Sequence, residues 1–372
     1  MKKVLFAIPT LGGGGAERVL VTLLNNLDKD KYDITLFSMF DGGINKRYLN
    51  ENIHYRYYFK KSFRGNIHFL KLFTPESLYR KMIKEDYDIV ISYLEGSMTR
   101  VISGCLNKNT KIINWVHIEI NDPKVLLQTY RNKHELEKSY SKYDATVFVS
   151  DTARTAFQKT FKNISGNMLV KYNSVDTDLI KSKSIERVDD IKFESKKVNL
   201  ISVGRFTEQK GYIRLLEIIN MLIRNDKLNI HLYLLGKGEL ENKYRSVIEK
   251  YGLNKHVTIL GYKDNPYQYV RNSDLFVCSS YCEGYSTAVT ESLIVGTPVV
   301  TTLCSGMEEM LGHNNEYGLI TKNSKEDLYK GMKRILTESG LLKHYKEKAE
   351  ERGRSFSTEK TVEEIEHLLD NC

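Results

Sequence analysis

Short apolar runs alternate with segments of helical period along the whole chain. In the first half, five of these runs have the length and apolar character of buried strands: KVLFAIP (3–9), YDITLFSMF (32–40), YDIVISYL (87–94), KIINWVHI (111–118) and DATVFVS (144–150). The pattern then restarts with five more: VNLISVGRF (198–206), NIHLYLLGKG (229–238), HVTILGY (256–262), SDLFVCSS (273–280) and TPVVTT (297–302). Strands that alternate with helices in this way are typical of parallel sheets covered on both faces.

The chain has 372 residues, which favours two domains, because a single hydrophobic core stops growing at roughly 250–300 residues. We predict an α/β fold made of two Rossmann-like, doubly wound domains that face a cleft. The N-terminal domain is expected at residues 1–175 and the C-terminal domain at 198–350, with a polar linker at 176–197. A final helix at 351–372 either stays with the second domain or crosses back to the first. Ligands of such sheets bind at the carboxyl ends of the strands.

Composition excludes several classes of protein. No apolar run approaches the ~20 residues of a transmembrane helix. The apolar run after Lys2 and Lys3 has no small-residue cleavage site, so a strand explains it better than a signal peptide. The five cysteines are scattered and have no histidine cluster beside them, which favours reduced thiols over a zinc site. The net charge of +9 favours an anionic partner such as a nucleotide, a nucleic acid or lipid headgroups.

Residues 54–84, which we name the basic–aromatic segment, concentrate positive charge beside aromatic rings. Eight Lys and Arg residues in this segment face one acidic residue, Glu76, and eight aromatic residues are interleaved with them. Rings that sit at the headgroup level and cations that meet anionic lipid suit a membrane surface. Single-stranded nucleic acid is a competing partner, and an ordinary solvated surface is the third interpretation.

The stretch CEGYSTAVTESLIVGTP (282–298) holds two glutamates around a predicted helix start. Glu283 precedes the helix, and Glu291 lies inside it, roughly 7 Å along the axis from its start. The free backbone N–H groups of the first turn form an anion site that the helix dipole strengthens. These groups belong to Ser286, the predicted N-cap, and to Thr287 and Ala288. An acid at each end of an anion site suits a nucleotide-sugar, which has a diphosphate between two hydroxylated rings. A salt-bridged surface pair is the alternative.

A second stretch, VGRFTEQKGY (203–212), follows the first strand of the second domain. Arg205 and Lys210 lie five residues apart on a turn bracketed by Gly204 and Gly211. Fixed cations stabilise the charge that develops on a departing diphosphate, and such electrostatic stabilisation is usually the largest catalytic term. Both residues are otherwise explained as solvated loop cations.

Together, these stretches resemble glycosyltransferase family 4, whose members are retaining enzymes with the two-domain GT-B fold. The motif of two glutamates separated by seven residues, set between a strand and a helix, carries the resemblance. By this resemblance Glu283 contacts the transferred sugar, Glu291 contacts the ribose hydroxyls, and Arg205 and Lys210 clamp the diphosphate.

The resemblance also extends to glycine-rich turns and to the first domain. Gly204, Gly238 and Tyr262 match positions that line the nucleotide, although packing is an alternative role for Tyr262. In IPTLGGGGAERVL (8–20) the loop residues that would face the donor phosphate and sugar are Gly13, Gly14 and Gly15. His117 matches a histidine near the donor sugar, and a structural role is its alternative.

Two short motifs would indicate other kinds of binding site. Asp41 follows the second strand and imitates the ribose-binding acid of a dinucleotide fingerprint, but the spacing of the glycines does not fit. Asp176-Thr177-Asp178 spells the metal motif of another glycosyltransferase fold, but its place resembles an interdomain turn of family 4. We expect no metal or other cofactor.

The resemblance implies a retaining, metal-independent transferase that moves a hexose from a nucleotide-sugar, expected to be a UDP-sugar, to a saccharide acceptor. We expect a lipid-linked acceptor used in capsule or other surface polysaccharide synthesis. The expected location is the cytoplasm, peripheral on the inner face of the cell membrane, with contact through residues 54–84 and no nucleic acid. The alternatives are a nucleotide-sugar epimerase or hydrolase and a non-catalytic sugar- or nucleic-acid-binding protein.

Overall fold

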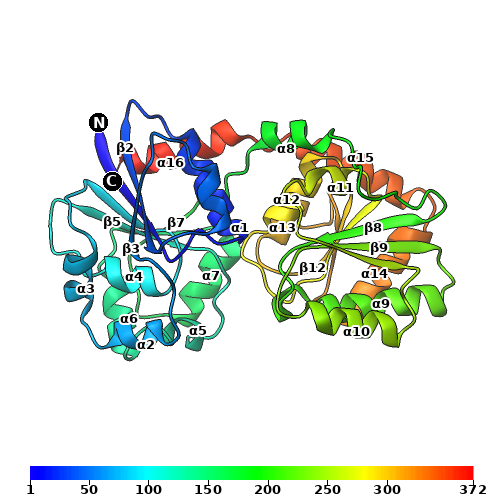
Figure 1. The fold of residues 1–372 in the computed structure, drawn as a ribbon, viewed down its shortest axis with the longest axis horizontal. Helices are drawn as coiled ribbons and strands as arrows, with labels where there is room; N and C mark the ends of the chain where they lie inside the picture. Colours follow the sequence, from blue (N-terminus) through cyan, green and yellow to red (C-terminus); the bar gives the residue numbers. More distant parts are fainter. Residues whose placement is uncertain (372) are drawn as a thin grey trace. The chain divides into compact units, whose positions relative to one another are not determined.

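The computed structural model describes residues 1–371, and the chain divides into two compact units (Figure 1). The first unit contains Met1–Val175 together with the residues from Thr358 onward, and the second contains Asp176–Ser357. Each unit is built on one parallel sheet with helices between successive strands, which confirms the predicted α/β class. Cys372 lies outside the described residues.

The first unit has a seven-stranded parallel sheet in the order β3-β2-β1-β4-β5-β6-β7. Its strands are β1 (Lys2–Ile8), β2 (Tyr32–Phe40), β3 (His54–Phe59), β4 (Ile89–Ser92), β5 (Lys111–Val116), β6 (Ala145–Phe148) and β7 (Asn167–Val170). Its helices are α1 (Gly15–Asn26), η1 (Ile44–Tyr48), α2 (Asn66–Lys71), α3 (Pro75–Met82), α4 (Ser97–Ile102), α5 (Lys124–Leu127), α6 (Lys133–Tyr140), α7 (Asp151–Thr160) and α16 (Thr358–Asp370).

The second unit has a six-stranded parallel sheet in the order β10-β9-β8-β11-β12-β13. Its strands are β8 (Val198–Val203), β9 (Ile230–Leu235), β10 (Val257–Gly261), β11 (Leu275–Cys278), β12 (Val299–Thr302) and β13 (Leu319–Thr321). Its helices are α8 (Thr177–Ser184), η2 (Glu208–Lys210), α9 (Tyr212–Arg224), α10 (Glu241–Lys250), α11 (Tyr267–Arg271), α12 (Thr287–Ile294), α13 (Met307–Leu311), α14 (Lys325–Thr337) and α15 (Leu341–Gly353).

The two sheets share a topology that places a binding edge in each. The first strand of each unit lies in the interior: β1 is between β2 and β4, and β8 is between β9 and β11. Strand order reverses at these strands, and ligands of doubly wound sheets bind at the carboxyl ends beside such a reversal. Interior strands are buried on both faces, which explains their unbroken apolar runs, such as Val4 to Ile8.

Three strands were not predicted, and all three lie at the edges of their sheets: β3, β7 and β13. Strand β3 belongs to the basic–aromatic segment, and most of its residues are exposed. An edge strand has neighbours on one side only, so its sequence need not be continuously apolar. The period of apolar residues therefore finds the interior strands and, of the four edge strands, only β10.

The predicted linker at 176–197 was wrong in its first part, which forms helix α8 of the second unit. Asp176 caps this helix, because its Oδ1 accepts a hydrogen bond from the Leu179 N–H at 2.9 Å. Ile180 is buried, and α8 packs against α11 and α12. The Asp-Thr-Asp motif is thus explained in part by helix capping.

Helix α16 lies in the first unit, which is one of the two placements considered for the C-terminal helix. The Lys2 Nζ donates to the Leu369 carbonyl at 2.8 Å, and the Tyr32 hydroxyl donates to the Asp370 Oδ1 at 2.7 Å. The buried side chains of Ile365 and Leu369 lie on the same helix. These contacts fix the helix to the start of the first sheet.

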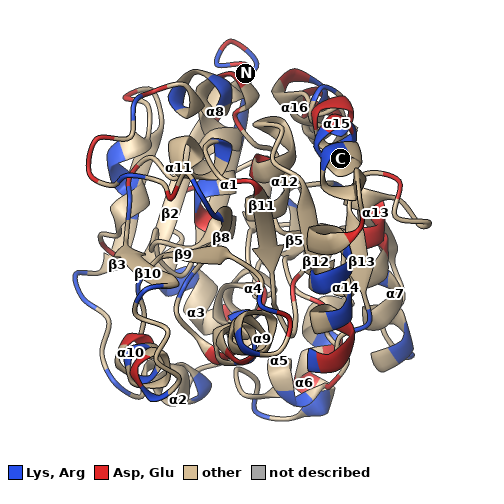
Figure 2. Cartoon of the chain, turned by 90° about the vertical axis from the view of Figure 1, so that its right-hand side faces the viewer, with Lys and Arg blue, Asp and Glu red and all other residues tan. Residues whose placement is uncertain are grey.

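Basic and acidic residues both lie on helices α10 and α14 of the second unit (Figure 2). Helix α10 carries the ion pair between Arg245 and Glu241, and α14 carries the pair between Arg334 and its flanking Glu338. Such exposed pairs contribute little to stability and mark solvated faces. Among residues 1–371, no helix is long and apolar enough to cross a membrane.

Candidate active site

In the second unit, Glu283 is presented by the loop between β11 and α12, residues 279–286, which we name the Glu283 loop. Strand β11 is fully buried and pairs with β8, so the loop begins at the edge where ligands of this topology bind. Helix α12 begins immediately after the loop.

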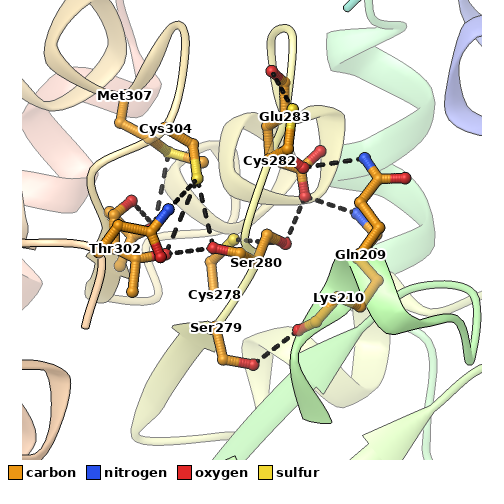
Figure 3. A network of polar contacts seen from close by, with 12 residues as sticks. Gln209, Lys210, Cys278, Ser279, Ser280, Cys282, Glu283, Thr302, Cys304 and Met307 are labelled. Atoms are coloured by element: carbon orange, nitrogen blue, oxygen red, sulfur yellow. Dashed lines mark hydrogen bonds and ion pairs between the residues drawn. The ribbon is translucent and has the colours of Figure 1, made fainter. Parts of the chain in front are cut away.

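Glu283 is held by two polar partners (Figure 3). Its Oε1 lies 2.7 Å from the Lys210 Nζ and accepts a hydrogen bond from the Ser280 Oγ at 2.5 Å. Only 7% of Glu283 is exposed, so an unpaired carboxylate here would be costly. Burial alone would lower the pKa of Lys210, but the negative charge of Glu283 outweighs it and the pKa is raised. Lys210 therefore stays charged beside the acid.

The start of α12 has no side-chain cap. Ser286 occupies the N-cap position, as predicted, but its side chain makes no capping hydrogen bond. A small pocket of about 10 Å³, the room of roughly one water molecule, lies here and is lined by Lys210, Ser280, Ser286 and Ala288 among others. Thr287 is the first helical residue. A cation and hydroxyl groups thus line a pocket beside the first turn of α12, where a helix start favours an anion.

Arg214, which sequence reasoning missed, holds the Glu283 loop through hydrogen bonds to its backbone carbonyls. Only 4% of this residue is exposed. Its Nε and Nη2 donate to the Ser279 carbonyl at 2.9 and 2.6 Å, and Nη2 also donates to the Ser280 carbonyl at 2.6 Å. Its guanidinium lies 3.9 Å from the centre of the Tyr281 ring. A planar fork of donors binds several carbonyls at once, which a lysine cannot do.

The remaining carbonyls of the Glu283 loop are bound from other segments. Asn323 donates to the Tyr281 carbonyl at 2.8 Å and accepts from the Arg214 Nη1 at the same distance. Thr302 donates to the Ser280 carbonyl at 2.6 Å, and Gln209 donates to the Cys282 carbonyl at 2.8 Å (Figure 3). No motif links these residues, because they come from distant segments that meet only in the folded unit.

The other acid and cation predicted in this unit, Glu291 and Arg205, are not among the hydrogen-bond partners of Glu283 and Lys210 given above. Arg205 is exposed, and within residues 1–371 its side chain makes no recorded hydrogen bond or ion pair. Glu291 lies in the second turn of α12 and is half-buried, and 42% of Tyr262 is exposed. The structure therefore joins Lys210 to Glu283 directly, whereas sequence reasoning placed Lys210 with Arg205.

Packing requires glycine at one of the predicted nucleotide-lining positions, Gly238. A Cβ on Gly238 would lie 2.4 Å from the Phe206 carbonyl oxygen. The neighbouring Gly236 is constrained in the same way, because its φ is +143° and its Cβ would lie 1.9 Å from the Gly204 carbonyl oxygen. A Cβ on Gly204 itself would meet side-chain atoms of Lys210 and Tyr212 at 3.0 Å. Close approach of two backbones accounts for Gly236 and Gly238 without any ligand. A role of these glycines beside the nucleotide stays a prediction.

The predicted residues of the first unit gather at the carboxyl edge of its own sheet. The glycine loop follows β1, with Gly14 at the N-cap of α1, Gly15 as its first residue and Gly13 exposed before them. His117 follows β5, and only 8% of it is exposed. Burial lowers the pKa of His117 to about 3, so its imidazole is neutral at pH 7.

Two family models match consecutive parts of the chain. The model described as Glycosyltransferase Family 4 matches residues 13–179, and the model described as Glycosyl transferases group 1 matches residues 184–352. The chain belongs to glycosyltransferase family 4.

Relatives and solved structures agree with this assignment. The N-acetylgalactosamine-N,N'-diacetylbacillosaminyl-diphospho-undecaprenol 4-alpha-N-acetylgalactosaminyltransferase of Campylobacter jejuni is 29% identical over 99% of this chain and 100% of its own length. Anabaena HepE in complex with UDP and glucose has a TM-score of 0.75 at 16% identity, over 100% of both chains. Sucrose-phosphate synthase from Thermosynechococcus elongatus has a TM-score of 0.77 at 14% identity, over 100% of this chain and 99% of its own. The predicted GT-B fold and glycosyltransferase activity are confirmed.

The contacts of this glycosyltransferase also weaken the rival motifs. The Asp41 Oδ1 lies 2.8 Å from the Lys46 Nζ and accepts from the Tyr55 hydroxyl at 3.1 Å, so it already has partners. Within residues 1–371, no group of three or more His, Cys, Asp or Glu side chains is placed to hold a metal ion. The four cysteines in the same range are free thiols.

Proposed function

We propose that this glycosyltransferase moves a hexose from a UDP-sugar to a lipid-linked saccharide with retention at the anomeric carbon. One observation carries the proposal: the Glu283 carboxylate, in the loop that leads into α12, lies 2.7 Å from the Lys210 ammonium, and the N-cap residue of that helix makes no side-chain cap. A diphosphate and a sugar hydroxyl are the ligand groups that suit a cation, an acid and free N–H groups in one place.

Each predicted residue takes one part of the donor in this proposal. Lys210 and Arg205 hold the diphosphate with the first-turn N–H groups of α12. Glu283 accepts a hydrogen bond from a hydroxyl of the transferred sugar, and Glu291 accepts from the ribose. Lys210 donates to Glu283 in the structure, so it also fixes the position of that carboxylate. The likeness of the fold to HepE, which was crystallised with UDP and glucose, supports a UDP-sugar.

Retention is proposed to proceed by front-face attack. The bond between the anomeric carbon and the diphosphate oxygen breaks, and the acceptor oxygen forms a new bond on the same face. The acceptor's proton passes to the departing diphosphate. Lys210, Arg205 and the helix dipole stabilise the leaving charge, so the proposal requires no metal. NMR of the new linkage checks the stereochemistry, and inversion would contradict it; full turnover in EDTA is expected.

The acceptor is proposed from the relative and from the surface. The Campylobacter relative is named for a diphospho-undecaprenol saccharide. In this chain the basic–aromatic segment exposes Tyr57, Tyr58, Phe63 and Phe69, and 74% of Leu72 is exposed. Rings Phe59, Phe63, Phe69 and Phe73 form a continuous series of edge-to-face contacts, 5.4 to 5.8 Å between centres. We propose that this face rests on the inner membrane surface during surface polysaccharide synthesis, such as capsule assembly.

Donor binding and transfer test the central proposal together. A thermal-shift panel of UDP-, GDP- and ADP-sugars is expected to show stabilisation by UDP-sugars; a ligand at about 100 times its Kd contributes roughly 2.7 kcal/mol. Glu283→Gln is expected to keep UDP binding and lose transfer. Donor turnover without an acceptor would favour a hydrolase or an epimerase, and no nucleotide binding would overturn the proposal.

Vesicle co-sedimentation tests the membrane contact separately. Vesicles with anionic phospholipid are expected to bind the protein at low salt, and the variant Lys60→Glu/Lys61→Glu/Phe63→Ser is expected to lose binding. A matched control, Lys343→Glu/Lys346→Glu on exposed positions of α15, makes the same change in charge. Equal loss in the control, or binding to single-stranded RNA and not to vesicles, would contradict the proposed membrane face.

A further inference from the structure

The two sheets of this enzyme carry an acid at matching places. Strand β4 lies beside the first strand of its unit, as β11 does in the other. Each of these strands is followed by a Glu-Gly pair just before the next helix: Glu95-Gly96 before α4 and Glu283-Gly284 before α12. Glu95 therefore holds in the first unit the topological place that Glu283 holds in the second. No motif pointed to it.

Glu95 lies in a protein environment that leaves its carboxylate without a cation. Its Oε2 accepts a hydrogen bond from the His117 backbone N–H at 2.9 Å. Among residues 1–371, no Lys or Arg side chain is recorded in contact with it. Burial, helped by the negative charge of Glu17, raises the pKa of Glu95 above its usual value. An acid in such a place is stabilised by a ligand that donates a hydrogen bond to it.

His117 supplies a second polar atom at the same edge. Its ring lies 4.7 Å from that of Tyr93, which follows β4, and its Nε2 is buried without a hydrogen-bond partner. Buried polar atoms are nearly always paired, so an orphan calls for a partner such as a ligand or a water molecule. The other ring nitrogen hydrogen-bonds the Tyr93 backbone carbonyl, so in the neutral imidazole the Nε2 is an acceptor.

The glycine loop brings a third group to this edge. A Cβ on Gly14 would lie 2.1 Å from the Glu17 Oε2, so the carboxylate of Glu17 lies against the loop that follows β1. Strand β1 pairs with β4, so the loop after β1 and the end of β4 lie at the same edge of the sheet.

We propose that Glu95 is a further hydroxyl-binding residue beside His117: one sugar hydroxyl donates to the Glu95 carboxylate, and an adjacent hydroxyl of the same sugar donates to the His117 Nε2. The inference rests on the proposed function in taking a sugar as the ligand. The sugar is either the hexose of the donor or a residue of the acceptor. Two adjacent hydroxyls supply one proton to each acceptor, so they satisfy both groups without adding charge.

A first experiment measures sugar binding without turnover. Protein labelled with 15N-histidine is titrated with the free methyl α-glycosides of glucose and N-acetylgalactosamine, and the His117 signal is assigned from His117→Asn. The wild-type Nε2 signal is expected to shift, and in Glu95→Gln the affinity is expected to fall about tenfold to hundredfold. No shift with either glycoside at its solubility limit would overturn the inference.

A second experiment separates the two sources of the sugar. Steady-state rates are measured for wild type, Glu95→Gln and Glu119→Gln, a neighbouring acid that accepts from Asn121 at 2.8 Å and is outside the site. A raised KM for the donor assigns the site to the transferred hexose, and a raised KM for the acceptor assigns it to the acceptor. UDP stabilisation equal to wild type shows that Glu95→Gln is folded and that the donor site is intact. Wild-type KM values in Glu95→Gln would overturn the inference, whereas failure of UDP to bind wild type overturns the proposed function.

Discussion

Glu283 and Glu95 lie in the loops that follow equivalent strands, β11 and β4, of two sheets with the same topology. Their surroundings differ. Glu283 has a cation and a hydroxyl within hydrogen-bond distance, and its loop is held by a buried arginine. Glu95 has a backbone N–H and the charge of another acid nearby. The strand order places an acid at a binding edge, but neighbouring segments decide whether it is neutralised before a ligand arrives.

This difference has a chemical consequence. A carboxylate that is already paired stays ionised and fixed, which suits a residue that must keep one geometry while charge develops on a diphosphate. A carboxylate without a cation is costly to keep charged and gains most from a ligand that donates a hydrogen bond. The surroundings of Glu283 therefore suit a site that binds a charged diphosphate, whereas those of Glu95 suit a neutral hydroxyl.

The largest effect is expected from breaking the pair in the second unit. Lys210→Met leaves Glu283 buried without its cation, so unfolding in urea should show a loss of about 3–5 kcal/mol, and transfer should fall about 10²- to 10³-fold. Lys243→Met is the control, because its pair with Glu208 is exposed and should contribute about 1 kcal/mol or less. Equal losses in the two variants would show that the Glu283 pair is no different from a surface pair.

The support of the Glu283 loop is tested next. Arg214→Lys keeps the charge but loses the fork that binds the Ser279 and Ser280 carbonyls, so a loss of about 2 kcal/mol in unfolding free energy is expected. A higher KM for the donor should accompany it, because the loop carries Glu283. Arg224→Lys, on the exposed end of α9, is the control. A stability loss with unchanged KM would mean that Arg214 holds the fold and not the site.

The buried histidine of the first unit predicts a pH dependence. The pKa of His117 is lowered from 6.5 to about 3 by burial, so the unfolded chain takes up more protons below pH 6.5. Stability is therefore lost as the pH falls from 6.5 towards 3, by about 2 kcal/mol at pH 5. Denaturant titrations from pH 5 to 7 check this, with His117→Asn expected to be less sensitive. A variant slope as steep as that of wild type would contradict it.

The smallest expected effect is a change in stability. Replacing Glu95 or Glu283 with glutamine should change the free energy of unfolding in opposite directions. Burial raises the pKa of Glu95, so the charged carboxylate costs stability at pH 7. Glu95→Gln removes this cost, and the variant should be more stable than the wild type at that pH. The gain should vanish as the pH falls to about 4.5. Glu283→Gln should instead be less stable at pH 7, because it breaks the ion pair. The same sign for both would remove the contrast between the units.

Periodicity of the sequence located the interior strands, because a strand buried on both faces must be apolar throughout. It missed the edge strands β3, β7 and β13. It also assigned the residues of α8 to the linker, because Ile180 is the only large apolar residue among the buried residues of that helix. The predicted cleft between the two domains and the roles of Arg205, Glu291 and Tyr262 stay predictions.

Local spacing alone determined that Glu283 precedes a helix start and that Ser286 is its N-cap, since both depend on residues adjacent in the chain. Only the tertiary structure decided that Lys210 pairs with Glu283 across 73 positions of sequence, that Arg214 holds the loop, and that Glu95 accepts from the His117 backbone N–H instead of pairing with a cation of the described chain. Whether a charge is paired depends on segments that meet through packing of the sheet, and no local pattern records which segments those are.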